Sequence, residues 1–557
     1  MRDIQTALKN VVKQQFGHDI TPELTRPDEQ FGDYATNAAL QLAGRLGRPP
    51  REIAEELAAA LKNELPQLKD VAVAGPGFIN VTLDDDALLA AAEAAPHAKP
   101  QTYKGKVVVA EYSDPNPFKA LHAGHLYTTL VGDAISSLLE AAGAKVHRVN
   151  YGGDVGLHVA RAMWGIIHFL GGEHPEKLAD ISEAERATWI SKRYVEGNAA
   201  YEQDETAKAE IIALNKRVYQ LHETGDKTSP FAHIYWTCRQ WSYDGFDNLY
   251  AQLQIHPFER YIPESEVTPP GLEIVKKGLK EGVFAESDGA IVYKGEDEGL
   301  HTRVFINSNG LPTYEAKDLG LAATKWRDYK FDLGFIITGN DIVEYMKVII
   351  KALGHFYPEV AERSRHLTHG MIRLPGGKKM SSRKGNNPMA QDILDAAVAA
   401  NKAATGADDN NVVLAAVKYA FLKYRIGGDM IYNPEESVSL EGDSGPYLQY
   451  AHARARSILV KAGEAKGEAA GLDAAERSLA RKISEYPEVI AKAVEELMPH
   501  HIAVYLYELA QSFNRFYEHN RVVGDPRQTT RQQLVALYAD VLKDGLTLLN
   551  IAAPERL

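Results

Sequence analysis

Hydrophobic positions change their spacing along the 557 residues, and the changes divide the chain into three parts. Up to residue 85, helical patterns alternate with one short strand-like run, GFINVTL (77–83). An alanine-rich stretch then breaks at Pro96 and Pro100, which predicts a domain boundary there. From residue 409 onward the apolar positions recur at helical spacing. We therefore expect three domains, over residues 1–98, 99–408 and 409–557.

The middle part alternates between strand-like and helical patterns. KVVVAEY (106–112) and KVHRVNY (145–151) are apolar runs of strand length, and a helical pattern between them ends at Gly143. A strand, a helix and a second strand joined by a short return predict a parallel βαβ unit. A further strand-like run lies at 331–339. We expect an α/β fold with a parallel sheet in two halves, separated by an insertion near residues 155–300.

Composition excludes several classes of protein. With 45% hydrophobic and 25% charged residues the chain is typical of globular domains, and no apolar run of about 18 residues predicts a membrane span. The single cysteine, Cys238, excludes a disulfide framework and a cysteine-rich zinc site, and predicts a cytoplasmic location. The net charge of −13 argues only weakly against a nucleic-acid partner, because a large acidic protein can carry a basic face.

The segment PNPFKALHAGH (115–125) lies where a predicted strand leads into a helix. A helix N-terminus carries free N–H groups and a partial positive charge, so it attracts phosphate. His122 and His125 flank that end, and Gly124 between them leaves room for a flat ring. We predict that the histidines hold phosphoryl oxygens, and the alternative is a pair of packed or capping histidines. No further metal ligands stand at a recognisable spacing, so we expect no structural metal.

A second candidate segment is RLPGGKKMSSRKGNN (373–387), which has five basic residues and no acidic one. Such a loop can bring ammonium groups to a triphosphate, or it is simply a solvated basic loop. Elsewhere, Glu111 closes the first strand of the middle part, and Tyr314 and Asp318 would share one helix face. Carboxylates can bind a guanidinium group in a bidentate manner, although a surface salt bridge is the alternative.

Together these motifs resemble those of class I aminoacyl-tRNA synthetases. HAGH resembles the HIGH signature, and KMSSR (379–383) resembles the KMSKS signature. EYSDPNPFKALHAGHLYTTLVGD, RVNYGGDVG, LPTYEAKDLG and EGDSGPYLQYAHARARSI resemble arginyl-tRNA synthetases specifically. The resemblance implies a Rossmann-type parallel-sheet catalytic domain with an insertion, an N-terminal α+β domain and a C-terminal all-α anticodon-binding domain.

The resemblance also implies a reaction and its partners. ATP with Mg²⁺ and L-arginine would give arginyl-adenylate, and tRNA(Arg) would then receive the arginyl group. The ATP site would comprise His122, Gly124, His125, Lys379, Met380, Ser381 and Lys384. The arginine site would comprise Glu111, Asn116, Tyr314, Asp318 and Asp341. The tRNA would be contacted by Phe78, Asn80, Tyr447 and Tyr450, for which core or helix packing is the alternative.

Two residues depart from the family pattern. Tyr127 stands where the family usually has an arginine, and Ser382 stands where the KMSKS signature has its second lysine. Lys384 would supply the missing charge. Other hypotheses are a small-molecule nucleotidyltransferase, a non-catalytic tRNA-binding paralogue, and another class I specificity such as cysteine. We expect a monomer.

Overall fold

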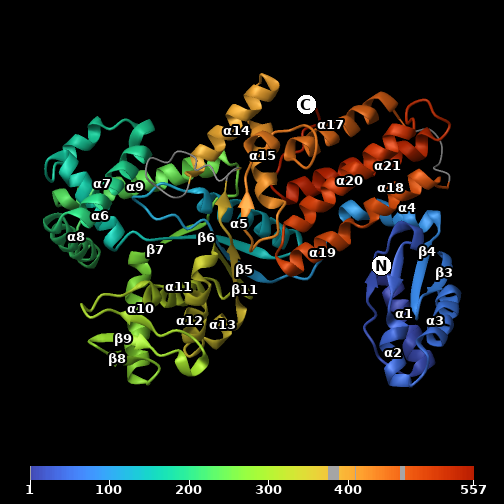
Figure 1. The fold of residues 1–557 in the computed structure, drawn as a ribbon, viewed down its shortest axis with the longest axis horizontal. Coiled ribbons are helices and arrows are strands. Elements are labelled where there is room, and N and C mark those ends of the chain that lie inside the picture. The colour runs from blue at the N-terminus through green and yellow to red at the C-terminus, as the bar shows by residue number, and fades with distance from the viewer. Residues whose placement is uncertain (1, 374, 376–387, 408, 465–470, 557) are drawn as a thin grey trace.

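The computed structural model describes residues 2–373, 375, 388–407, 409–464 and 471–556. Three units follow one another along the chain (Figure 1). An N-terminal α/β unit is drawn in blue, a large central unit carries a parallel sheet, and a helical unit in orange and red ends the chain. The expected fold class is therefore confirmed.

The N-terminal unit contains a four-stranded antiparallel sheet in the order β1-β2-β4-β3. Along β4, Ile79 and Val81 are buried, whereas Phe78 is exposed and Asn80 is half-buried, as the two-residue period of a strand requires. The strands are β1 Leu24–Thr25, β2 Tyr34–Thr36, β3 Leu68–Ala74 and β4 Phe78–Leu83, and the helices are α1 Arg2–Phe16, α2 Ala38–Leu46, α3 Pro50–Glu64 and α4 Asp85–Ala94.

The central unit contains a five-stranded, all-parallel sheet in the order β12-β11-β5-β6-β7. The predicted βαβ unit is present, with helix α5 (Ala123–Ala141) between β5 and β6. β6 and β7, which follow β5 in the chain, lie on one side of it. β11 and β12 come later in the chain and lie on the other side. The sheet order therefore switches between β5 and β11, where open α/β sheets bind ligands. The strands are β5 Val107–Glu111, β6 Lys145–Gly152, β7 Arg260–Pro263, β11 Leu333–Gly339 and β12 Ser364–His369.

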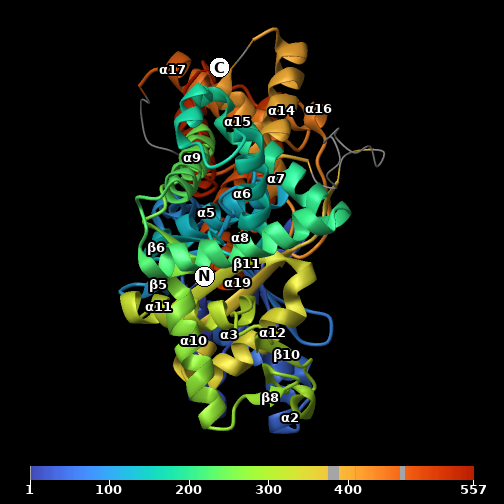
Figure 2. The same ribbon diagram turned by 90° about the vertical axis from the view of Figure 1, so that its left-hand side faces the viewer.

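The range 155–300 consists of two parts, because β7 lies within it and pairs with β6. A helical part precedes β7, and a part with α10 and a small antiparallel sheet, β10-β9-β8, follows it. Figure 2 shows the helical part above the second part. The helical part comprises α6 Leu157–Leu170, α7 Arg186–Gln203, α8 Glu205–Thr224 and α9 Pro230–Gln252. The second comprises α10 Glu264–Lys280, β8 Ala285–Ser287, β9 Ala290–Tyr293 and β10 Arg303–Ile306, and leads to α11 Tyr314–Tyr329, α12 Val343–Gly354 and α13 Pro358–Arg363.

Among the described residues of the C-terminal part, the only strand is the two-residue β14 (Met430–Ile431), which pairs with β13 (Ile372–Arg373). The expectation of helices alone beyond residue 409 is corrected in this detail. Gly427 and Gly428 precede β14 and favour a break in the helical pattern. The helices are α14 Ala390–Thr405, α15 Asn410–Leu422, α16 Pro434–Ser437, α17 Gly445–Ala462, α18 Ala474–Ser484, α19 Tyr486–Glu496, α20 His500–His519 and α21 Gln528–Leu548.

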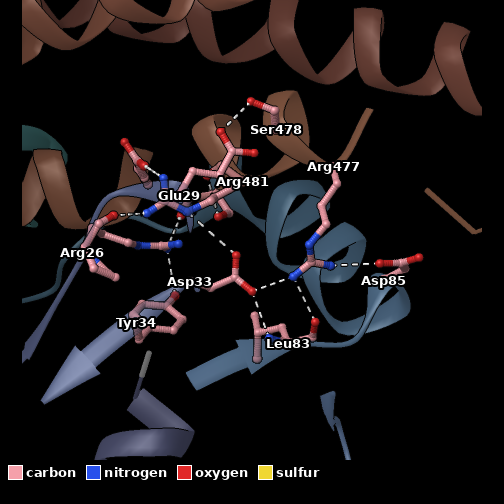
Figure 3. A network of polar contacts seen from close by, with 12 residues as sticks. Arg26, Glu29, Asp33, Tyr34, Leu83, Asp85, Arg477, Ser478 and Arg481 are labelled. Atoms are coloured by element: carbon pink, nitrogen blue, oxygen red, sulfur yellow. Dashed lines mark hydrogen bonds and ion pairs between the residues drawn. The ribbon is translucent and has the colours of Figure 1, made fainter. Parts of the chain in front are cut away.

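A polar network joins the N-terminal unit to α18 and α19 (Figure 3). Arg477 of α18 donates to Asp33 at 2.6 Å, to Asp85 at 2.8 Å and to the Leu83 carbonyl at 2.9 Å. Arg26 forms a bidentate pair with Glu488 of α19, at 2.9 and 3.0 Å. Ion pairs that are largely removed from water fix the relative orientation of the two units.

Candidate active site

A cavity of about 610 Å³ lies at the carboxyl ends of β5, β11 and β12, beside the N-terminus of α5. Its volume is in the range of sites for small ligands and cofactors. We call it the first cavity. Its lining includes Asp114, His122, Gly124, His125, Asp341 and His369.

His122 and His125 cap α5 and also line the first cavity. His122 Nδ1 accepts the Gly124 N–H at 3.1 Å, His125 Nδ1 accepts the His122 N–H at 3.2 Å, and the rings stack at 3.8 Å. Burial lowers the pKa of His122 to about 4 and the pKa of His125 well below its usual value. Both rings are therefore neutral at pH 7. Because each Nδ1 is an acceptor, the ring proton is assigned to Nε2, which can donate to a ligand oxygen.

A side chain at position 124 would require His122 to move. A Cβ atom there would lie 2.9 Å from His122 Cε1. Tyr127, the departure from the family pattern, is 2% exposed and packs against His369 at a ring distance of 4.8 Å. It therefore supports the wall of the first cavity through His369.

A second cavity of about 530 Å³ adjoins the first, because Asp114 and Thr338 line both. The sheet and α11 bring four of the five residues predicted for the arginine site to this second cavity: Glu111, Asn116, Tyr314 and Asp318. The fifth, Asp341, is exposed and lines the first cavity instead.

Carboxyl groups outnumber cations in the lining of the second cavity, which contains Glu111, Asp114, Glu315 and Asp318 against Arg303 and Lys325. Asp318 accepts the Tyr345 hydroxyl at 2.5 Å, and burial raises the pKa of Asp318 to about 7, with a further contribution from the charge of Glu111. Burial and the Glu111 charge also raise the pKa of Asp114 well above its usual value. Glu111 itself forms a buried ion pair with Lys325 of α11. Such a pocket suits a cationic ligand that can donate several hydrogen bonds.

The loop between β5 and α5 is held in an unusual conformation. Ser113, Asp114 and Phe118 have φ values of 74°, 49° and 67°, a region that non-glycine residues rarely occupy. Asp114 accepts the Tyr151 N–H and Asn116 accepts the Gly153 N–H, at 2.8 and 2.7 Å. Backbone strain of this kind is concentrated at functional sites.

Sequence reasoning missed Asp114, Lys325, Tyr345 and His369. Lys325 stands seven residues after Asp318, a helical spacing that could have identified it. Tyr345 and His369 come from distant parts of the chain, and no local pattern indicates them.

The residues predicted to contact tRNA lie on two units. Phe78 is 42% exposed, so the structure contradicts the alternative of a core residue, and Asn80 lies on the same face of β4. Tyr450 of α17 is 47% exposed, whereas the Tyr447 hydroxyl accepts Asn514 at 2.7 Å. Lys379, Met380, Ser381 and Lys384 lie outside the described residues.

Comparison with known families accounts for almost the whole chain. Residues 87–431 match the model of the tRNA synthetases class I (R), catalytic domain, which covers more than half of the sequence. The chain belongs to the arginyl-tRNA synthetase family. The resemblance inferred from the motifs is thus confirmed. Residues 2–83 match the arginyl tRNA synthetase N terminal domain, and residues 448–557 match the DALR anticodon binding domain.

Similar proteins match the chain over nearly their full length. An arginine–tRNA ligase from Phocaeicola vulgatus is 28% identical over 100% of this chain and 99% of its own. One from Synechococcus sp. is 31% identical over 95% of this chain and 94% of its own. The structure of Thermus thermophilus arginyl-tRNA synthetase is 25% identical, covers 100% of both chains and has a TM-score of 0.82.

Two features are absent from the described residues. None of their helices is long and apolar enough to cross a membrane. They also contain no group of three or more His, Cys, Asp or Glu side chains that could hold a metal ion.

Proposed function

We propose that the chain attaches L-arginine to tRNA(Arg) at the expense of ATP, as the named relatives do. One observation carries the proposal: a cavity with paired neutral histidines at a helix N-terminus adjoins an acidic cavity, and Asp114 and Thr338 line both. A nucleotide in the first cavity and an arginine in the second would meet at these shared residues.

In the first step, a carboxylate oxygen of arginine attacks the α-phosphorus of ATP. The bond from that phosphorus to the bridging oxygen breaks, and pyrophosphate leaves with the electron pair. His122 and His125 would donate from Nε2 to the phosphoryl oxygens as negative charge moves toward pyrophosphate. The predicted loop residues Lys379, Met380, Ser381 and Lys384, together with Mg²⁺, would hold the same charge.

The second cavity would position the amino acid. Asp318 would bind the guanidinium group, with Tyr314 beside it. Glu111 and Asn116 would hold the α-amino group and the other polar groups of the arginine. Asp341 fits this role less well, because it lies at the first cavity. We assign it to the edge that the two cavities share.

In the second step, a ribose hydroxyl at the 3′ end of the tRNA attacks the carbonyl carbon of arginyl-adenylate, and AMP leaves. Phe78 and Asn80 would contact one part of the tRNA, and Tyr447 and Tyr450 would contact unpaired anticodon bases. We propose that these roles belong to three domains, over residues 1–98, 99–408 and 409–557. We further propose that the chain acts as a monomer in the cytoplasm.

ATP–pyrophosphate exchange with each amino acid, measured with and without tRNA, tests the proposed function. We expect exchange with arginine in the presence of tRNA(Arg). Exchange with a different amino acid, or none under any condition with folded protein, would overturn the proposal.

A further inference from the structure

Tyr151 of β6 has a buried hydroxyl group without a hydrogen-bond partner among the described residues. Its side chain lines the second cavity, and its backbone N–H is held by Asp114 at 2.8 Å. A buried hydroxyl that makes no hydrogen bond destabilises the unliganded protein. A ligand that forms a hydrogen bond with it would remove this cost.

The polar groups around this hydroxyl already have partners. Glu264 is paired with Lys317 at 2.6 Å, and Asp318 accepts the Tyr345 hydroxyl at 2.5 Å. Glu111 is paired with Lys325. Unlike these carboxylates, the Tyr151 hydroxyl has no partner among the described residues, so all of its hydrogen-bonding capacity is left for a ligand.

The charge around Tyr151 indicates which ligand group would meet it. Burial raises the pKa of Tyr151 well above its usual value, and the negative charges of Glu264 and Asp318 raise it further. The hydroxyl therefore stays protonated in an acidic environment. That environment favours a cation, and a cationic N–H can donate to the hydroxyl oxygen.

We propose that Tyr151 is a specificity-determining residue whose hydroxyl accepts one N–H of the substrate guanidinium group. The assignment rests on the proposed function. A guanidinium group has five N–H donors in a fixed plane, so it can satisfy this hydroxyl and a carboxylate together. A lysine ammonium group has three donors at a single point, and it would leave one of the acceptors unmatched.

Replacement of Tyr151 by phenylalanine tests the assignment, because only the hydroxyl is removed. We expect kcat/KM for arginine to fall by about tenfold to a hundredfold at saturating tRNA and ATP, the range for a hydrogen bond to a charged group. The KM for ATP should not rise, and the melting temperature should not fall. The preference for arginine over lysine should decrease.

Tyr538→Phe is the matched control. The Tyr538 hydroxyl is also buried and without a partner among the described residues, but it lies in α21, where the ring stacks on Phe513. This variant should retain the parent kinetics.

The outcomes separate the two proposals. A parent chain that never charges tRNA with arginine overturns the proposed function and the tyrosine assignment with it. A parent that charges arginine, with Tyr151→Phe within twofold of its kcat/KM, overturns the assignment alone. Equal losses for arginine and ATP, or a lower melting temperature, would also overturn it, because the hydroxyl would then have a structural role.

Discussion

Asp318 combines a substrate-facing carboxylate with a pKa near neutrality, and this makes arginine binding dependent on pH. Its pKa in the folded chain, about 7, lies above the ordinary value of 3.8. Between pH 3.8 and about 7 the folded state therefore binds a proton that the unfolded chain has released. The contribution of this proton to the free energy of unfolding is fully present below pH 3.8 and is lost as the pH rises through 7. A guanidinium group needs the ionised form. We expect the Kd for arginine, measured by calorimetry, to rise about tenfold for each pH unit below 7.

Asp318→Asn provides the control for that pH dependence. The variant should bind arginine at least tenfold more weakly at pH 8, because the charge-assisted hydrogen bonds are lost. Its Kd should vary little between pH 5.5 and 8, and its KM for ATP should change much less than its KM for arginine. Equal increases in the two KM values would contradict the assignment of Asp318 to the guanidinium group.

Gly124 is a residue at which a single methyl group should affect ATP and not arginine. In Gly124→Ala the new Cβ would lie 2.9 Å from His122 Cε1, so the imidazole must move. We expect the KM for ATP to rise by about tenfold, while arginine binding without ATP is unchanged. Gly44→Ala in α2 is the control, since nothing lies within 4 Å of its Cβ position. Unchanged ATP kinetics in Gly124→Ala would show that this packing does not position the histidine.

Residues of the candidate site could be predicted where the site is built from contiguous sequence. His122, Gly124 and His125 stand together at one helix start, so a local motif contains them. Tyr345 reaches the second cavity only because α12 packs against α11. Partners brought together by tertiary packing leave no local pattern in a single sequence.

At the scale of elements, the ion pair between Glu111 and Lys325 fastens α11 to β5. Both side chains are buried, at 3% and 6% exposure. Lys325→Met would leave an uncompensated buried carboxylate, which typically costs about 3–5 kcal/mol. We expect a clear fall in the melting temperature of the transition that includes the central unit, measured by calorimetry.

The control for this variant is a lysine at the opposite end of β5. Lys106 pairs with Asp332 at 3.4 Å, but both side chains are substantially exposed. Lys106→Met should cost less than about 1 kcal/mol, as exposed pairs generally do. Similar losses in the two variants would contradict the structural role of the buried pair.

The strands of the central sheet differ in how well the sequence predicts them. β5, β6 and β11 are apolar runs between turn signals; β5 and β11 lie within the predicted ranges, and β6 extends one residue beyond its range, to Gly152. β7 has only four residues, RYIP, with one of them fully buried, so it carries neither alternation nor an apolar run. Its place in the sheet is decided by pairing with β6, which explains why the range 155–300 looked like one insertion.

At the scale of the whole molecule, the two units proposed to contact tRNA are joined through α18. Arg477 bridges Asp33 and Asp85 of the N-terminal part, and Asp33 is 2% exposed (Figure 3). These ion pairs tie α18 to the N-terminal part that carries Phe78, and so they restrain its distance from Tyr450 on α17. A rigid spacing lowers the entropy that binding must otherwise remove.

Arg477→Met should weaken the contact between the N-terminal part and α18, because it leaves the buried Asp33 carboxylate without its closest cation. We expect the KM for tRNA(Arg) to rise by about fivefold to tenfold, with arginine and ATP binding unchanged, measured in aminoacylation assays at saturating small substrates. Arg48→Met is the control, since Arg48 pairs with Glu56 on the exposed surface of the N-terminal unit, away from α18. An unchanged KM for tRNA in Arg477→Met would show that each unit binds tRNA independently of the other.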